Sequence, residues 1–124
     1  DARCSQVYNA LFEVRGGKTE RKCEDRAVML EELIGELKEI NEPILLVGDG
    51  ANLTYNRIKN ENPELLESVS LAENKLFQHA AGVCLLSQKM LDSGVKAVPA
   101  DELMLNYLRL PQAERELKKK ENVK

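Results

Sequence analysis

The residues best suited to chemistry are Gly48, Asp49 and Gly50, which follow the apolar run at residues 44–47 and precede a helical pattern. A helix N-terminus that follows a buried strand can bind a phosphate group. No Lys-Ser or Lys-Thr pair follows, as a Walker motif requires, and the Asp49 carboxylate would repel a phosphate unless a metal ion intervened. We interpret the three residues as a strand-to-helix turn in which glycine supplies the backbone dihedral angles, and we keep them as candidates for cofactor binding.

Nucleophilic catalysis and metal binding lack their usual partner residues in this sequence. His79 is the only histidine, so no HxxxH metal pair exists. Cys84 follows it by five positions, which places the two side chains on different sides of a predicted helix. The remaining cysteines, Cys4 and Cys23, form no CxxC pair, and no serine lies in a Gly-x-Ser-x-Gly motif. We therefore expect reduced thiols, no catalytic residue and no metal site.

Charged residues near the two ends leave two interpretations open. Asp1 and Arg3 could bind a polar ligand, because a carboxylate and a guanidinium both form strong polar contacts. Arg109, which follows Tyr107 by two positions, could anchor a carboxylate. Both segments are equally consistent with charges beside an edge strand.

The first elements of the chain predict an N-terminal β-hairpin. Residues 6–14 are rich in β-forming side chains and predict a strand. Gly16 and Gly17 follow, and glycine adopts the positive φ of a tight turn at little cost. Residues 19–23 can then return as a second, more polar strand, which leaves one edge of the hairpin exposed.

Helices and strands alternate in the rest of the chain. A mixture of helical apolar periodicity and short apolar runs is the signature of an α/β fold, here a mixed sheet with flanking helices. We expect a single lobe over residues 1–111 and a helical or frayed tail over 112–124. The predicted elements are a helix over 30–40, a buried, central and parallel strand over 44–47, a helix over 51–60, a strand over 66–71, a helix over 74–93 capped by Asn74, and an extended or strand-like segment over 103–110.

Composition excludes several classes of protein. The chain is 43% hydrophobic and 31% charged, which suits a globular domain and not a disordered one. The net charge is -3, and the one basic run, at residues 118–120, lies among glutamates, so we expect no direct nucleic-acid binding. No apolar run approaches the ~20 residues of a membrane span. The sequence therefore predicts a cytoplasmic protein without a membrane partner.

Three ordered segments of the chain resemble the TsaB (YeaZ) family. DARCSQVYNALF at residues 1–12 is similar to the family's DARxxxVYxALF, and LLVGDGA at residues 45–51 is similar to its LLVGDGA. The segment at residues 99–116 resembles the C-terminal signature PNYLRxSQAERE, with Leu105 and Pro111 where the family usually has Pro and Ser. The family-motif residues are Asp1, Arg3, Tyr8, Gly48, Asp49, Gly50, Tyr107, Arg109 and Glu114.

The resemblance implies a fold and a set of partners. TsaB proteins have two RNase H-like lobes of the actin-like ATPase superfamily, and this chain would be the second lobe, starting between the lobes of a larger protein. They are non-catalytic relatives of the glycoprotease-like TsaD and work with TsaD and TsaE to make N6-threonylcarbamoyladenosine (t6A) in tRNA. TsaD supplies the chemistry, so ATP and metal are expected on the partner subunit. The main TsaD contact lies in the first lobe, so this chain alone should pair poorly.

Two alternatives to this scaffold function stay open. The chain could be a glycoprotease-like or nucleotide-binding enzyme lobe that uses Gly48, Asp49 and Gly50. It could also form a homo-oligomer, because a lobe without its companion exposes apolar surface that favours association.

Overall fold

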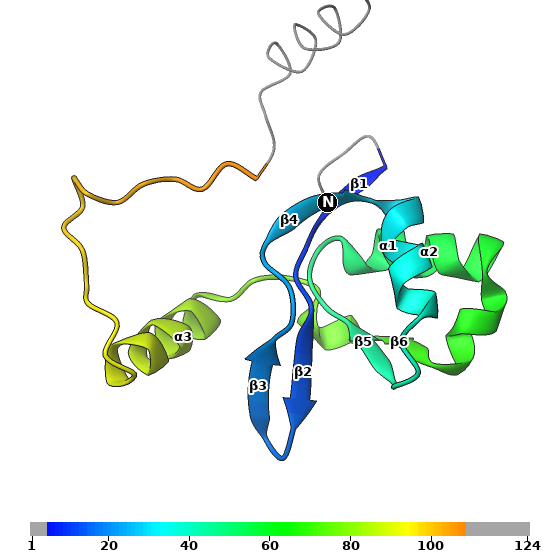
Figure 1. Ribbon diagram of the computed structural model, residues 1–124, viewed down its shortest axis with the longest axis horizontal. Coiled ribbons are helices and arrows are strands. Elements are labelled where there is room, and N and C mark those ends of the chain that lie inside the picture. The colour runs from blue at the N-terminus through cyan, green and yellow to red at the C-terminus, as the bar shows by residue number, and fades with distance from the viewer. Residues whose placement is uncertain (1–4, 109–124) are drawn as a thin grey trace, which may run out of the picture.

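The computed structural model describes residues 5–108, and within that range the chain is a small α/β protein (Figure 1). Its strands form three two-stranded ladders, two antiparallel and one parallel. No helix in the described range is both long and apolar enough to cross a bilayer. The finer prediction of an RNase H-like lobe stays a prediction.

A long antiparallel hairpin opens the fold and confirms the predicted turn. Gly16 and Gly17 both have positive φ, 56° and 76°, at its tip. Towards the open end of the hairpin, two further strands continue the pairing. The inner ladder is β2 (Phe12–Arg15) with β3 (Lys18–Arg21), and the outer ladder is β1 (Gln6–Asn9) with β4 (Arg26–Met29).

A kink divides this hairpin, so the prediction of one unbroken strand over residues 6–14 is wrong. Between the two ladders, residues 10–11 face residues 22–25, which gives one strand two extra residues. Leu11 marks the site, because its N–H donates to Cys23 Sγ at 3.1 Å and its carbonyl accepts the Lys22 N–H at 2.8 Å. Extra residues on one strand bend a ladder, which accounts for the kink. The strand beyond the kink, β4, was not predicted from the sequence.

Helix α1 (Leu30–Lys38) confirms the predicted helix, although it ends two residues earlier. Its four buried side chains recur at the predicted helical spacing, because one stripe faces the strands. They are Leu30, Leu33, Ile34 and Leu37.

A parallel pair of strands lies at the centre of the sequence. β5 (Ile44–Leu46) pairs with β6 (Val69–Leu71), as the prediction of a parallel neighbour required. The predicted central position is wrong for the described residues, because β6 is the one strand that pairs with β5 there. The strand is also buried on one face only, since Leu45 is 59% exposed. Part of the predicted strand over 66–71 is instead a short 3-10 helix, η1 (Pro63–Glu67).

Helix α2 (Ala51–Glu61) confirms the predicted helix and completes the core. Ile58, which is fully buried, contacts a cluster that draws on β1, β4, α1, β5 and β6. The core therefore lies between the strands on one side and helices α1 and α2 on the other. The buried cluster comprises Val7, Val28, Leu30, Leu33, Ile34, Leu37, Ile44, Ile58, Leu65 and Val69.

Helix α3 (Ala80–Asp92) starts later than predicted, and Figure 1 shows it apart from the other helices. A 3-10 turn, η2 (Glu73–Lys75), occupies the position where Asn74 was expected to cap the helix, so that prediction is wrong. The predicted end is confirmed, because Gly94 has φ = 91° and donates its N–H to the Leu91 carbonyl at 2.9 Å. With the bond from the Val95 N–H to the Met90 carbonyl at 3.0 Å, this is a Schellman motif.

The segment after α3 was predicted to be extended or strand-like, and it forms no strand over residues 103–108, so the strand form of that prediction is wrong for this described part. Four of its side chains are at least two-thirds exposed, and no ladder satisfies its backbone there. Residues 109–110 and the predicted tail over 112–124 lie outside the described residues.

Candidate functional site

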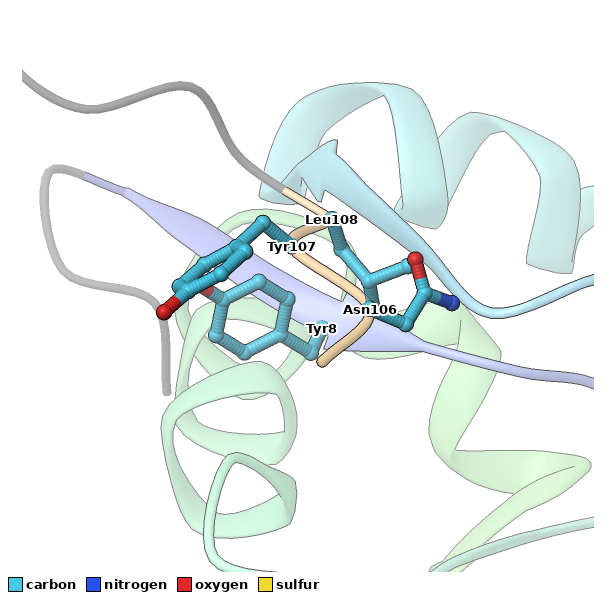
Figure 2. A pocket seen from close by; sticks show the side chains of 4 residues that line it. All are labelled: Tyr8, Asn106, Tyr107 and Leu108. Carbon is cyan, nitrogen blue, oxygen red and sulfur yellow. The ribbon is translucent and has the colours of Figure 1, made fainter. Parts of the chain in front are cut away.

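The first and last family-like segments meet in space at a shallow hollow on β1. Tyr8 forms one side of it, and Asn106, Tyr107 and Leu108 form the other (Figure 2). Figure 2 shows the two phenol rings next to each other, with the Asn106 amide pointing away from them. Two motif residues that are almost a hundred positions apart, Tyr8 and Tyr107, therefore share one site.

The size of this hollow decides what it can hold. Its volume is about 210 Å³, which is below the ~300–1,000 Å³ of typical small-molecule sites. Tyr8 is 52% and Tyr107 76% exposed, so the hollow is open to water. Two phenol rings and an apolar side chain suit contact with one planar or apolar group. The site fits a single inserted side chain better than a nucleotide.

The Gly48-Asp49-Gly50 segment forms the turn that the sequence predicted. Gly48 has φ = 92°, which glycine adopts readily, and Gly50 occupies the N-cap position of α2. The Gly48 N–H donates to the Lys75 carbonyl at 2.9 Å, and the Gly48 carbonyl accepts the Ala51 N–H at 3.1 Å. The Thr54 hydroxyl donates to the Gly50 carbonyl at 3.1 Å. These bonds use the polar backbone of the turn to join β5, α2 and η2.

His79 lies at the N-cap of α3 and not in the middle of a helix, so its predicted position is wrong. Its backbone is extended, and its carbonyl accepts the N–H groups of Gly82 and Val83. Cys84 is exposed on the same helix. Over residues 5–108, no three His, Cys, Asp or Glu side chains are grouped so that they could hold a metal ion.

Several predicted site residues cannot be placed relative to the hollow. Asp1, Arg3, Arg109 and Glu114 lie outside the described residues. Their roles as motif residues stay predictions.

Sequence reasoning missed an ion-pair network that joins β1, β4 and α1. Arg26 on β4 donates to Glu36 Oε1 on α1 at 2.9 Å and also pairs with Oε2 of that carboxylate. Its Nε donates to Asn9 Oδ1 at 3.2 Å, next to Tyr8 on β1. The hydrogen bond from Arg26 holds the pKa of Glu36 below its ordinary value. Asn9 and Arg26 face each other only in the β1–β4 register, so nothing in the sequence pattern indicated the network.

A second network of ion pairs crosses the β2–β3 ladder. Lys22 Nζ lies 2.7 Å from Glu13 Oε2 and 2.9 Å from Glu20 Oε1, and Arg15 also pairs with Glu13. The hydrogen bond from Lys22 is the main cause that lowers the pKa of Glu13. The Glu13 side chain is 20% exposed, but its partners Arg15 and Lys22 are 75% and 38% exposed, so the network adds little to stability.

Comparison with known proteins gives one partial likeness. No family model and no solved structure matches the chain. The tRNA threonylcarbamoyladenosine biosynthesis protein TsaB of Bacillus subtilis is 35% identical over 60 residues, which are 48% of this chain and 26% of that protein. The chain thus matches about a quarter of the length of this relative. The likeness supports a TsaB-like relationship over about half of the chain.

Proposed function

We propose that this chain is a non-catalytic scaffold lobe in the synthesis of t6A in tRNA. The observation that carries the proposal is the 35% identity to the Bacillus subtilis TsaB protein. The chain acts as the second lobe of a two-lobe subunit, with residues 1–111 as the lobe and 112–124 as its tail.

The geometry of the described residues supports a scaffold function. The Gly48-Asp49-Gly50 turn joins three elements through its backbone, and the Tyr8 hollow is too small for a nucleotide. The net charge of -3 gives little attraction to tRNA phosphates, so a partner binds the tRNA. A TsaD-like subunit carries the metal and the chemistry in this proposal, and a TsaE-like subunit carries ATP.

A lobe-exchange experiment tests this proposal. This chain would replace the second lobe of Bacillus subtilis TsaB, and the chimera would be mixed with TsaD, TsaE, tRNA and the activated threonylcarbamoyl precursor. We expect the chimera to support t6A formation and the 124-residue chain alone to give none. Intact Bacillus subtilis TsaB is the positive control. A folded chimera without activity would contradict the proposed function, and activity of the chain alone would contradict its dependence on a first lobe.

Calorimetry separates the scaffold from the enzyme alternative. A nucleotide-binding lobe that uses the Gly48 turn must bind Mg-ATP in the isolated chain. We expect no heat of binding at millimolar Mg-ATP. A saturable heat that a Gly50→Val variant removes would favour the enzyme alternative.

A further inference from the structure

A groove lies between helices α1 and α2, which Figure 1 shows next to each other. Its volume is about 220 Å³, enough for one long side chain. The α1 residues that line it follow the helical spacing i, i+3, i+4 and i+7, so they share one side of that helix. We call it the α1–α2 groove, and its lining residues are Glu31, Ile34, Gly35 and Lys38 on α1 and Glu61 and Asn62 at the end of α2.

The floor of the α1–α2 groove is apolar, and its middle is open. Ile34 is 4% exposed and belongs to the core cluster. A Cβ added at Gly35 would have nothing within 4 Å, so the missing side chain leaves space above the helix. Such a floor suits the methylene stem of a lysine or arginine, which can lie along an apolar surface while its charged end stays in water.

Two carboxylates stand at the rim of the groove. Arg57 on α2 lies between them, with its Nη2 3.4 Å from Glu31 Oε1 and its Nε 2.7 Å from Glu61 Oε2. The Nε atom is buried and makes no well-aligned hydrogen bond among the described residues, so the contact with Glu61 is an ion pair alone. Glu31 and Glu61 are 79% and 48% exposed, which leaves one oxygen of each carboxylate to an incoming donor.

The charge of this part of the chain favours a basic partner. Residues 30–67, which contain both helices, carry nine acidic and three basic side chains, a net charge of -6, whereas the whole chain carries -3. The two basic side chains next to the groove are already paired, since Lys38 lies 3.6 Å from Glu64 and Arg57 is shared by two glutamates. A surface with an excess of one sign of charge attracts partners of the opposite sign and helps to fix how they dock.

We propose that the α1–α2 groove is an interaction surface for a basic segment of a partner protein, with one lysine side chain in the space above Gly35. The methylene stem of that lysine lies on Ile34 and Gly35, and its ammonium group donates to Glu31 and Glu61. Lysine fits better than arginine, because its compact ammonium group has three donors, whereas the guanidinium of Arg57 already occupies the position between the two carboxylates. The groove shares no residue with the Tyr8 hollow or the Gly48 turn.

Fluorescence anisotropy on the full 124-residue chain tests the groove, with a fluorescein-labelled helical peptide of AAKAA repeats as the probe. Gly35→Leu fills the space without changing the charge and should weaken binding about tenfold. Glu31→Gln and Glu61→Gln each remove one rim carboxylate and should weaken binding about threefold. Salt should also weaken binding to the wild type, because the rim is exposed.

Two matched variants separate the groove from the general charge of the surface. Gly82→Leu adds the same side chain at a glycine of α3 that also meets open space, and Glu32→Gln removes the same charge at the next position along α1. Both should bind the peptide as tightly as the wild type does. Equal affinities for the wild type and Gly35→Leu would overturn the proposal, and so would equal losses in Glu31→Gln and Glu32→Gln.

Two further measurements keep the outcome decisive. Circular dichroism checks that each variant folds, and the comparison of Glu31→Gln with Glu32→Gln decides the result if Gly35→Leu does not fold. Light scattering of the chain alone shows whether the basic hairpin tip of a second copy occupies the groove. Self-association that Lys18→Glu removes would assign the groove to a second copy and overturn the proposed partner.

Discussion

Residues 5–75 and residues 76–108 differ sharply in burial although both are rich in apolar side chains. Every buried side chain in the described range lies in the first region, including Ile58 at 0% exposure. In the second region, Leu76 and Leu108 are half-buried and all others are exposed. The comparison shows that apolar content alone does not bury a segment. The first region has strands and helices that cover each other, whereas the second has one helix that covers nothing.

The largest expected effect is on the free energy of unfolding, which should depend on the first region far more than on the second. Ile58→Ala removes a fully buried side chain and should lower the free energy of unfolding by about 3 kcal/mol. Leu85→Ala in α3 removes a 66% exposed side chain and should cost less than about 0.5 kcal/mol. Urea unfolding followed by circular dichroism measures both. Equal costs would break the distinction between the regions.

The Gly48 turn should matter through its backbone and not through contacts. Gly48→Ala places a Cβ in open space but forces φ = 92° on an L residue, which should cost about 1–2 kcal/mol. Gly35→Ala in α1 also meets open space, at an ordinary helical φ, and should stabilise by up to about 1 kcal/mol. The measurement is the urea midpoint of each variant. A neutral Gly48→Ala would show that the turn does not constrain the packed region.

Acid should weaken the packed region through Glu36. Because Arg26 lowers the pKa of Glu36, the ion pair stabilises the fold above the ordinary pKa near 4.5 and loses that effect as pH falls through the lower folded-state value. Both side chains are about a third or more exposed, so the effect should stay below about 1 kcal/mol. As the pH falls from 6 to 3, the free energy of unfolding should decrease more steeply for the wild type than for Glu36→Gln. High salt should reduce this difference between the wild type and the variant. If the free energies of unfolding of the two proteins ran parallel against pH at low salt, the prediction would be wrong.

The smallest expected effect is in the second region. Gly94 has nearly the same φ as Gly48, 91° against 92°, but it ends an unpacked helix. Gly94→Ala should therefore cost less than about 0.5 kcal/mol of global stability. Its effect should be local, with faster hydrogen exchange at the Val95 amide, which loses its bond to the Met90 carbonyl. A global cost equal to that of Gly48→Ala would show that α3 belongs to the cooperative core.

Local signals explain most of what sequence reasoning predicted correctly. The stripe in α1, the glycine turn at 16–17 and the end of α3 at Gly94 each depend on residues a few positions apart. The same reasoning placed the start of α3 at Asn74, because a capping side chain and apolar residues continue there. The 3-10 turn η2 was favoured instead, since its Lys75 carbonyl bonds to Gly48 in the distant turn.

In the candidate site, too, sequence motifs identified single residues, but the contacts between them depend on the tertiary structure. Tyr8 and Tyr107 were each singled out by motif, but their meeting in one hollow depends on the path of the chain after α3. The Arg26–Glu36–Asn9 network depends on the β1–β4 register, and the kink at Cys23 sets that register. Neither could be read from spacing along the chain.

The sequence by itself determined the α/β class, the two packed helices and the glycine turns, because hydrophobic periodicity and backbone dihedral preference act over a few residues. Only the tertiary structure decided which strands pair, which face of those strands is covered, and that α3 stands away from the core. Those outcomes depend on contacts between residues far apart in the chain, and a segment's own side chains do not specify the surface that will cover them.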